Sequence, residues 1–314
     1  MAGLFSVVLP VFLVLGFGYL VAWRGWMGAD AVDAVMRFAQ NFALPVLVFQ
    51  SMARLDIGHG FDLALLAAFY AGAFVSFFAG WAGGRWLFRR SPEDCVAIGF
   101  ICLFSNSLLL GLPLTERAYG PDSLAGNYAI IAIHSPLMYT FGITFMEFTR
   151  ARGMRLSVSR VAWRALSGVL RTPLVMGIIA GLAVNLLIQA GLVLPQGVWD
   201  AAAMMARAAI PAALFGLGGV LVRYRPAGDA GAIAMCCLCV LVLHPAVTYG
   251  LGRTFGLDAP AMRSAVVTAA MPPGVNAYLF AAMYGSAQRV AASTVLIATL
   301  AAVLTAWAWL SILP

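Results

Sequence analysis

The sequence predicts an all-α polytopic membrane protein, with ten transmembrane helices arranged as two inverted five-helix repeats. Three observations lead to this fold class. Hydrophobic residues make up 63% of the 314 positions and charged residues only 10%, which is more apolar surface than a soluble domain buries. Long apolar runs recur along the whole chain, and short motifs of the first half return in the second half.

Each apolar run is long enough to cross a bilayer, which takes about 20 helical residues. None of the runs alternates polar and apolar residues as a transmembrane β-strand does. The first run is uncharged to Trp23 and lacks the basic start of a secretory signal peptide, so we expect it to be retained. The predicted spans are 3–23, 34–53, 62–84, 95–115, 124–147, 171–192, 200–222, 230–251, 263–284 and 289–312.

The arginines predict the orientation of these spans, because short cytoplasmic loops carry an excess of basic residues. All nineteen basic residues are Arg, of which thirteen lie in odd-numbered loops and four in even-numbered loops. The odd-numbered loops are therefore expected in the cytoplasm and both termini outside, in the inner membrane of a bacterium. A net charge of +7 also suits nucleic-acid binding, but the arginines stand between apolar runs. We therefore expect membrane lipid as a partner and no nucleic acid.

Three pairs of similar segments relate the two halves of the chain. The pairs, each separated by 163 to 166 residues, are 44–49 with 210–215, 111–120 with 276–285, and Pro10 to Gly18 with Pro173 to Gly181. Because five spans are an odd number, the second copy enters the membrane from the opposite face, as in many secondary transporters. We expect a first repeat at 1–148, a basic cytoplasmic loop at 149–164 and a second repeat at 165–314.

The predicted fourth and ninth spans both contain helix breakers at mid-depth. The segment "AAMPPGVNAYLFAAMYG" at 269–285 has two prolines and a glycine in a row, and "FSNSLLLGLPL" at 104–114 has a similar signature. A proline inside a helix costs ~3 kcal/mol, and lipid cannot satisfy the backbone groups that a break frees. We therefore expect both spans to be broken and, as equivalent spans of an inverted repeat, to meet near the midplane of the membrane.

The two breaks predict one binding site for an anion. The half-helices that begin there would present free N–H groups and the positive ends of their dipoles to one point. The alternative is kinked packing, with the asparagine side chains bonded to the backbone. The candidate residues at the breaks are Ser105, Asn106, Ser107, Pro113, Pro272, Pro273, Gly274 and Asn276.

Three further polar residues within spans are candidates for the same site. His134 lies mid-span, where a neutral imidazole can bond a carboxylate and take up a proton; the alternative is a histidine satisfied by a neighbour. Arg207 either attracts the anion or extends its side chain to the membrane surface. Asn41, in the second span, is the third candidate.

The acidic residues and the cysteines argue against other functions. All twelve Asp and Glu lie at span ends or in loops, whereas a cation exchanger needs carboxylates at mid-depth. The thiols of "CCLC" at 236–239 cannot all face one ion on a helix, so we expect no metal site. The chain has no enzyme motif and no nucleotide-binding loop, so catalytic residues and cofactors are not expected. An intramembrane enzyme and an anion channel are the alternatives to a carrier.

Several segments resemble the auxin efflux carrier family, which includes plant carriers and bacterial malonate-type carriers. The two specific signatures are "NSLLLGLPLTERAYG" at 106–120 and "AAMPPGVNAYLFAAMYG" at 269–285. "MRFAQNFALPVLVF" at 36–49 and "YTFGITFMEF" at 139–148 support them. The chain departs from plant members at Ala277, where they carry a further proline, so auxin itself is not the expected substrate.

The resemblance implies ten helices, of which the fourth and ninth cross at their breaks at the midplane of the membrane. It also implies that a scaffold and a mobile transport domain move against each other in an elevator-type mechanism. It implies a secondary transporter of mono- or dicarboxylates, rather than an enzyme, that forms a homodimer. Asn106, Pro113, Pro272 and Gly274 match the motifs of the family, and His134 falls where plant members have a glutamine near the substrate.

Overall fold

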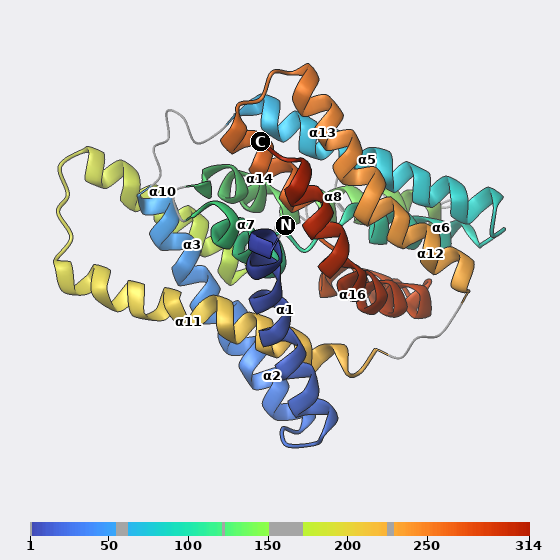
Figure 1. The fold of residues 1–314 in the computed structure, drawn as a ribbon, viewed down its shortest axis with the longest axis horizontal. Coiled ribbons are helices and arrows are strands. Elements are labelled where there is room, and N and C mark those ends of the chain that lie inside the picture. The colour runs from blue at the N-terminus through green and yellow to red at the C-terminus, as the bar shows by residue number, and fades with distance from the viewer. Residues whose placement is uncertain (1, 55–61, 121–122, 151–171, 225–228) are drawn as a thin grey trace. The chain divides into compact units, whose positions relative to one another are not determined.

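The computed structural model describes residues 2–54, 62–120, 123–150, 172–224 and 229–314, and every regular element within them is a helix (Figure 1). The all-α class expected from the composition is therefore confirmed for the described chain. The elements are α1 (Ala2–Trp23), α2 (Ala29–Phe38), η1 (Ala39–Ala43), α3 (Leu44–Ala53), α5 (Leu63–Trp86), α6 (Pro92–Leu103), η2 (Ser107–Gly111), α7 (Leu112–Tyr119), α8 (Ala125–Arg150), α10 (Pro173–Gln189), α11 (Gln196–Leu221), α12 (Ala230–Leu238), η4 (Cys239–Leu243), α13 (His244–Thr254), α14 (Ala259–Ala269), α15 (Val275–Tyr284) and α16 (Gln288–Ile312).

Six helical segments of the described chain are long and apolar enough to cross a membrane. They are Ala29–Ala53, Leu63–Trp86, Ala125–Arg150, Gln196–Leu221, Ala230–Thr254 and Gln288–Ile312. Shorter apolar helices lie at Val8–Trp23, Pro173–Gln189 and Val275–Tyr284. The helices stand where spans are predicted, while the count of ten and the inverted repeat stay predictions. Most of the predicted basic loop at 149–164 lies outside the described residues.

Acidic side chains begin several helices, which explains why they gather at the ends of the predicted spans. Asp62 accepts a hydrogen bond from the Ala64 N–H at the start of α5, at 2.8 Å. Asp258 accepts one from the Ala261 N–H at the start of α14, also at 2.8 Å. Each carboxylate satisfies an N–H group that has no acceptor within the helix, and its charge opposes the helix dipole.

Three short π-helical turns each end two residues before a proline. These are η1 before Pro45, η2 before Pro113 and η4 before Pro245. A proline has no N–H, and its ring displaces the carbonyl of the residue four positions earlier. The helix therefore widens locally, which leaves carbonyl oxygens that need another donor.

Trp309 in α16 supplies such a donor. Its Nε1–H donates at 2.9 Å to the carbonyl of Leu241, the residue four positions before Pro245. We expect Trp309→Phe to lower the free energy of unfolding by about 1 kcal/mol, because a carbonyl loses its donor. Trp307→Phe is the matched control, since the Trp307 indole makes no hydrogen bond to another described residue. Equal losses in the two variants, measured by thermal unfolding in detergent, would contradict this role.

The chain packs into two compact units, and each unit takes segments from both halves of the sequence. Unit 1 comprises Met1–Leu9, Asp62–Leu166 and Tyr224–Pro314, and unit 2 comprises Pro10–Phe61 and Ser167–Arg223. A packing unit and a sequence repeat divide a chain by different criteria. The repeats expected at 1–148 and 165–314 therefore stay a prediction.

Unit 2 joins α10 and α11 to α2, η1 and α3 by close backbone approaches. A Cβ atom on Gly177 or Gly181 of α10 would stand 2.5 Å from a carbonyl oxygen of α3. Farther along α10, Asn185 donates its Nδ2 to the carbonyls of Met52 (3.1 Å) and Ala53 (3.2 Å), at the end of α3. Small residues permit such contact where lipid provides no hydrophobic force for helix association.

The core of unit 1 is aromatic. The rings of Phe100 in α6 and Phe280 in α15 stack with centroids 3.8 Å apart and an interplanar angle of 12°. Phe77 in α5 meets Phe141 in α8 edge-on, with centroids 4.8 Å apart. Helix α5 packs against both α6 and α13 (Figure 1). The Phe100–Phe280 stack fixes α6 against α15, two helices that each adjoin a break.

Candidate functional site

The first break lies between α6 and η2. Phe104 is extended, with φ −92° and ψ 90°, and Asn106 has φ −79° and ψ 63°. The Asn106 Oδ1 accepts a hydrogen bond from the Leu109 N–H at 3.3 Å, so Asn106 caps η2. The hydroxyls of Ser105 and Ser107 lie 3.0 Å apart. All three predicted polar residues of this break are buried.

The second break separates α14 from α15 and has no side-chain cap. Residues Met271 to Gly274 are buried and lie outside both helices. Pro272 and Pro273 have no N–H with which to continue α14. Gly274 is the N-cap of α15, with φ −78° and ψ 172°, and it has no side chain to bond the N–H groups of the first turn.

The two breaks contact each other within unit 1. The Asn106 N–H donates to the carbonyl of Pro272 at 2.8 Å, and Ser105 and Pro273 form an antiparallel bridge. A Cβ atom on Gly274 would stand 3.5 Å from the Asn106 Cγ. A backbone carbonyl freed by the second break is therefore satisfied by the first, which makes an interrupted helix tolerable in apolar surroundings.

The two half-helix N-termini at these breaks differ. The prediction that both present free N–H groups is wrong for the first, because Asn106 uses its own Oδ1 to cap η2. At the start of α15 no side chain caps the helix, and the half-buried Asn276 amide makes no hydrogen bond to another described residue. An uncapped helix start carries roughly half a positive elementary charge. The start of α15 therefore favours an anion.

His134 in α8 lies beside the first break. Its ring centroid is 4.7 Å from that of Phe104, and the residue is 3% exposed. Neither ring nitrogen makes a hydrogen bond of standard geometry to a described residue, although the backbone of Ser105 is near. Five residues along α8, the Tyr139 hydroxyl donates to the carbonyl of Asn276 at 3.3 Å. Helix α8 therefore contacts both breaks.

The remaining candidates fall in different parts of the chain. Pro113 lies at the start of α7, directly after η2, and is buried with the first break. Asn41 in η1 and Arg207 in α11 belong to unit 2, and both are exposed. The structure thus gathers the other candidates in unit 1, while Asn41 and Arg207 stay candidates on unit 2.

Sequence reasoning missed a buried network beside the breaks. Asn127 in α8 donates its Nδ2 to the hydroxyl of Thr115 in α7 at 3.0 Å and to that of Thr268 in α14 at 2.9 Å. The Thr115 hydroxyl donates in turn to the carbonyl of Gly111 at 2.9 Å. An asparagine within an apolar span can indicate a buried polar contact. Asn127, however, stands close to the start of its predicted span, where it resembles a polar residue at the end of a span.

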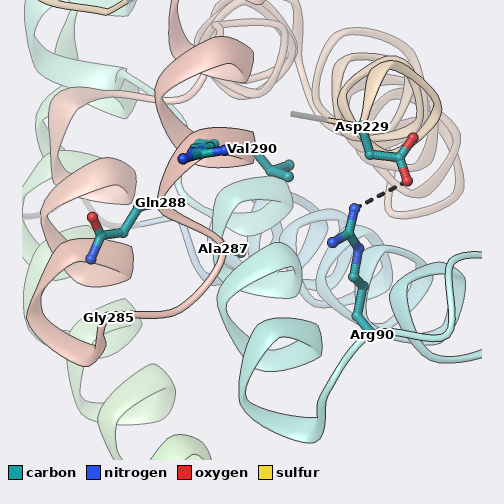
Figure 2. Close-up of a pocket in the computed structure, with 7 residues that line it drawn as sticks. Arg90, Asp229, Gly285, Ala287, Gln288 and Val290 are labelled. Carbon is teal, nitrogen blue, oxygen red and sulfur yellow. Dashed lines mark hydrogen bonds and ion pairs between the residues drawn. The ribbon is translucent and has the colours of Figure 1, made fainter. Parts of the chain in front are cut away.

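A hollow of about 450 Å³ lies at the other end of α15, about 15 Å along the helix from the breaks. In Figure 2 the guanidinium of Arg90 points at the carboxylate of Asp229, and the two are 3.1 Å apart. Asp94 accepts a hydrogen bond from the Ala287 N–H at 2.7 Å. The third, seventh and ninth predicted loops, which are expected on the same face of the membrane, therefore meet at this hollow. A partly exposed ion pair is worth at most about 1 kcal/mol, so we interpret the hollow as a loop junction.

The thiol of Cys102 lies close to those of Cys236 and Cys239 in the described part of the chain. No group of three or more His, Cys, Asp or Glu side chains there is placed to hold a metal ion. The five cysteines are free thiols, of which Cys237 is half-buried and the others are buried. They pack as small apolar side chains.

These features define a class, that of α-helical membrane proteins built around two interrupted helices that pair with each other. The chain belongs to the Membrane transport protein family, whose profile matches residues 4–310. It is 27% identical over 309 residues to the "Putative malonate transporter" of Rhizobium meliloti (strain 1021), a match that covers 97% of this chain and 94% of that protein.

Two other relatives extend the comparison. The "Uncharacterized transporter YfdV" of Escherichia coli (strain K12) is 23% identical over 96% of this chain and 95% of its own. The "Auxin efflux carrier component 2" of Arabidopsis thaliana is 28% identical over 153 residues, which are 49% of this chain and 23% of the plant protein. The resemblance to auxin efflux carriers drawn from the two signatures is therefore confirmed.

Proposed function

We propose that the protein is a secondary transporter of small organic anions, mono- or dicarboxylates, in the inner membrane of a bacterium. The observation that carries the proposal is the open N-terminus of α15 at the point where the two breaks pair. Membership of a membrane transport family supports it, and the similar protein of Rhizobium meliloti is named for malonate, a dicarboxylate.

The binding chemistry uses neutral donors. A carboxylate at the start of α15 would accept hydrogen bonds from the N–H groups of its first turn. The Asn106 Nδ2 remains available as a donor, because only the Oδ1 of that amide is used in capping. The amide of Asn276 is a further donor on the first turn. Without a substrate, such a site holds no unpaired buried charge, which would be costly.

We propose that transport proceeds by an elevator-type movement of unit 1 relative to unit 2. Unit 2 contains most of the first predicted span and the second, sixth and seventh, while unit 1 contains the remaining spans. Each unit thus takes equivalent spans from both predicted repeats, which supports ten spans in two inverted copies. The paired breaks belong to unit 1 and would move with the substrate.

Uptake of a panel of carboxylates into proteoliposomes tests the proposal. We expect saturable uptake of at least one mono- or dicarboxylate, and faster efflux when unlabelled substrate is present on the opposite side. Proton and sodium gradients are imposed separately, so that the coupling ion follows from the same measurement. Flux that does not saturate would indicate a channel, and chemical conversion in detergent would indicate an enzyme. Absence of any carboxylate flux would overturn the proposal.

Asn106→Ala and Asn276→Ala are each expected to lower the initial rate of uptake at least about tenfold. The reason is that a hydrogen bond to a charged group contributes about 1.5–3 kcal/mol. Rates are compared at equal amounts of reconstituted protein. Asn106→Ala also removes the cap of η2, so thermal unfolding of both variants is the control. Parental rates in both variants would remove the site from this position.

A further inference from the structure

Asn127 forms a network that the proposed anion site does not use. Its side chain is 0% exposed, and both hydrogens of its Nδ2 are engaged, with Thr115 (3.0 Å) and Thr268 (2.9 Å). Both threonines are also 0% exposed. Hydrogen bonds in such apolar surroundings are electrostatically stronger than hydrogen bonds in water.

The network ties together the two half-helices on one side of the breaks. Helix α7 continues the chain after the first break, and α14 leads into the second. Thr268 stands four residues before Pro272, and Gly111 stands five residues after Asn106. A Cβ atom on Gly111 would lie 3.6 Å from the Cα of Thr268, so the two segments are already in close contact. The bond of Asn127 to Thr268 therefore lies about one helical turn from the second break, and the bond to Thr115 about two and a half turns from the first.

We propose that Asn127 is a positioning residue, whose amide fixes α7 against α14 and thereby aligns the paired breaks that bind the anion. The proposal rests on the proposed function, because it concerns the alignment of the same site. The backbone pairing at Ser105 and Pro273 covers only a few residues. On one side of it the stacked rings of Phe100 and Phe280 hold α6 against α15. Asn127 supplies the matching constraint on the other side.

The chemistry of the residue supports a role beyond packing. A primary amide donates to two hydroxyls at once and stays neutral, which neither an aspartate nor a leucine does. The Asn127 Oδ1 is buried without a partner among the described residues, and a buried acceptor left unpaired costs stability. A leucine of similar volume would avoid this cost, so packing alone does not account for an asparagine.

Asn127→Leu is the first test, in the full-length protein. It is expected to raise KM for the transported carboxylate about tenfold, with the maximal rate within about twofold of the parental value. Asn185→Leu is the matched control, because Asn185 is also buried and donates its Nδ2 to two carbonyls, but within unit 2. It is expected to lower thermal stability without changing KM. An unchanged KM in Asn127→Leu would overturn the proposal.

Replacing the two threonines tests the same hydrogen bonds at their acceptors. Thr115→Val combined with Thr268→Val is expected to raise KM as much as Asn127→Leu does. Adding Asn127→Leu to this double variant is expected to raise KM no further, because the bonds are already absent. Fully additive increases would overturn the proposal. Serine at both positions keeps the hydroxyls and should preserve the parental KM. If Asn127→Leu does not fold, the KM values of the valine and serine double variants test the proposal in its place.

Amide hydrogen exchange provides a measurement that does not need transport. Peptides covering 104–111 and 270–277 are expected to exchange at least about threefold faster in Asn127→Leu than in the parental protein, and unchanged in Asn185→Leu. Unchanged exchange in Asn127→Leu would overturn the proposal. If no carboxylate is carried, the proposed function fails, while the exchange rates still decide whether Asn127 aligns the breaks.

Discussion

Gly274→Leu is expected to leave no measurable carboxylate uptake, while Gly274→Ala is expected to keep uptake within about threefold of the parental rate. The backbone of Gly274, at φ −78° and ψ 172°, is extended and suits any residue. An alanine methyl would stand 3.5 Å from the Asn106 Cγ, which is an ordinary van der Waals contact. A leucine side chain would extend farther toward the Asn106 side chain, into the place proposed for the carboxylate.

The measurement is the initial rate of uptake into proteoliposomes, at equal amounts of folded protein for the two variants. Because alanine and leucine replace the same glycine, loss of backbone freedom is common to both and cannot explain a difference between them. Uptake by Gly274→Leu at the rate of Gly274→Ala would contradict an anion site at the start of α15. Equal loss in both variants would also contradict it, since the methyl group alone does not reach the site.

Gly18→Leu is expected to lower the free energy of unfolding by about 3 kcal/mol or more, so that little folded protein survives purification. A Cβ atom at Gly18 of α1 would overlap the backbone carbonyl of Phe215 in α11. Gly218 of α11 similarly faces the carbonyl of Leu15. Backbone atoms cannot rotate away as a side chain can, so the two helices of unit 2 would have to separate. In lipid, such close packing is a main source of helix association.

Gly16→Leu is the matched control for Gly18→Leu. Gly16 lies two residues before Gly18 on the same helix, is exposed, and would have no atom within 4 Å of a new Cβ. It is expected to leave the midpoint of thermal unfolding in detergent unchanged. Similar midpoints for the two variants would show that α1 and α11 do not rely on this close approach.

The positions of the helices and of the breaks were predictable because their causes are local. An apolar run sets the length of a spanning helix, and the helices α8 and α16 lie within a few residues of the predicted spans 124–147 and 289–312. Pro272 and Pro273 lack an N–H whatever surrounds them, so the second break follows from the sequence. The structure shows this break between α14 and α15.

The hydrogen bonds of the candidate residues were less predictable, because they depend on geometry. The sequence leaves open whether the Asn106 amide faces an anion or bonds to the backbone, and in the structure its Oδ1 accepts a hydrogen bond from the Leu109 N–H and caps η2. That choice follows from the backbone angles of Asn106, φ −79° and ψ 63°, which the residue type does not specify. The open start of α15 differs because Gly274 has no side chain with which to cap it.

The amino-acid sequence established an all-helical membrane protein, its family, and the two spans that are broken. Packing established which side chains meet. Phe77 is fully buried and the adjacent Phe78 is 46% exposed, although their chemistry is identical. In water, hydrophobicity separates the inner face of a helix from the outer one. In a membrane, lipid and protein interior are both apolar, so hydrophobicity indicates depth but not the packed face. The hydrogen bonds of Asn127 to Thr115 and Thr268, 12 and 141 residues away in the sequence, therefore form only when the helices are packed together.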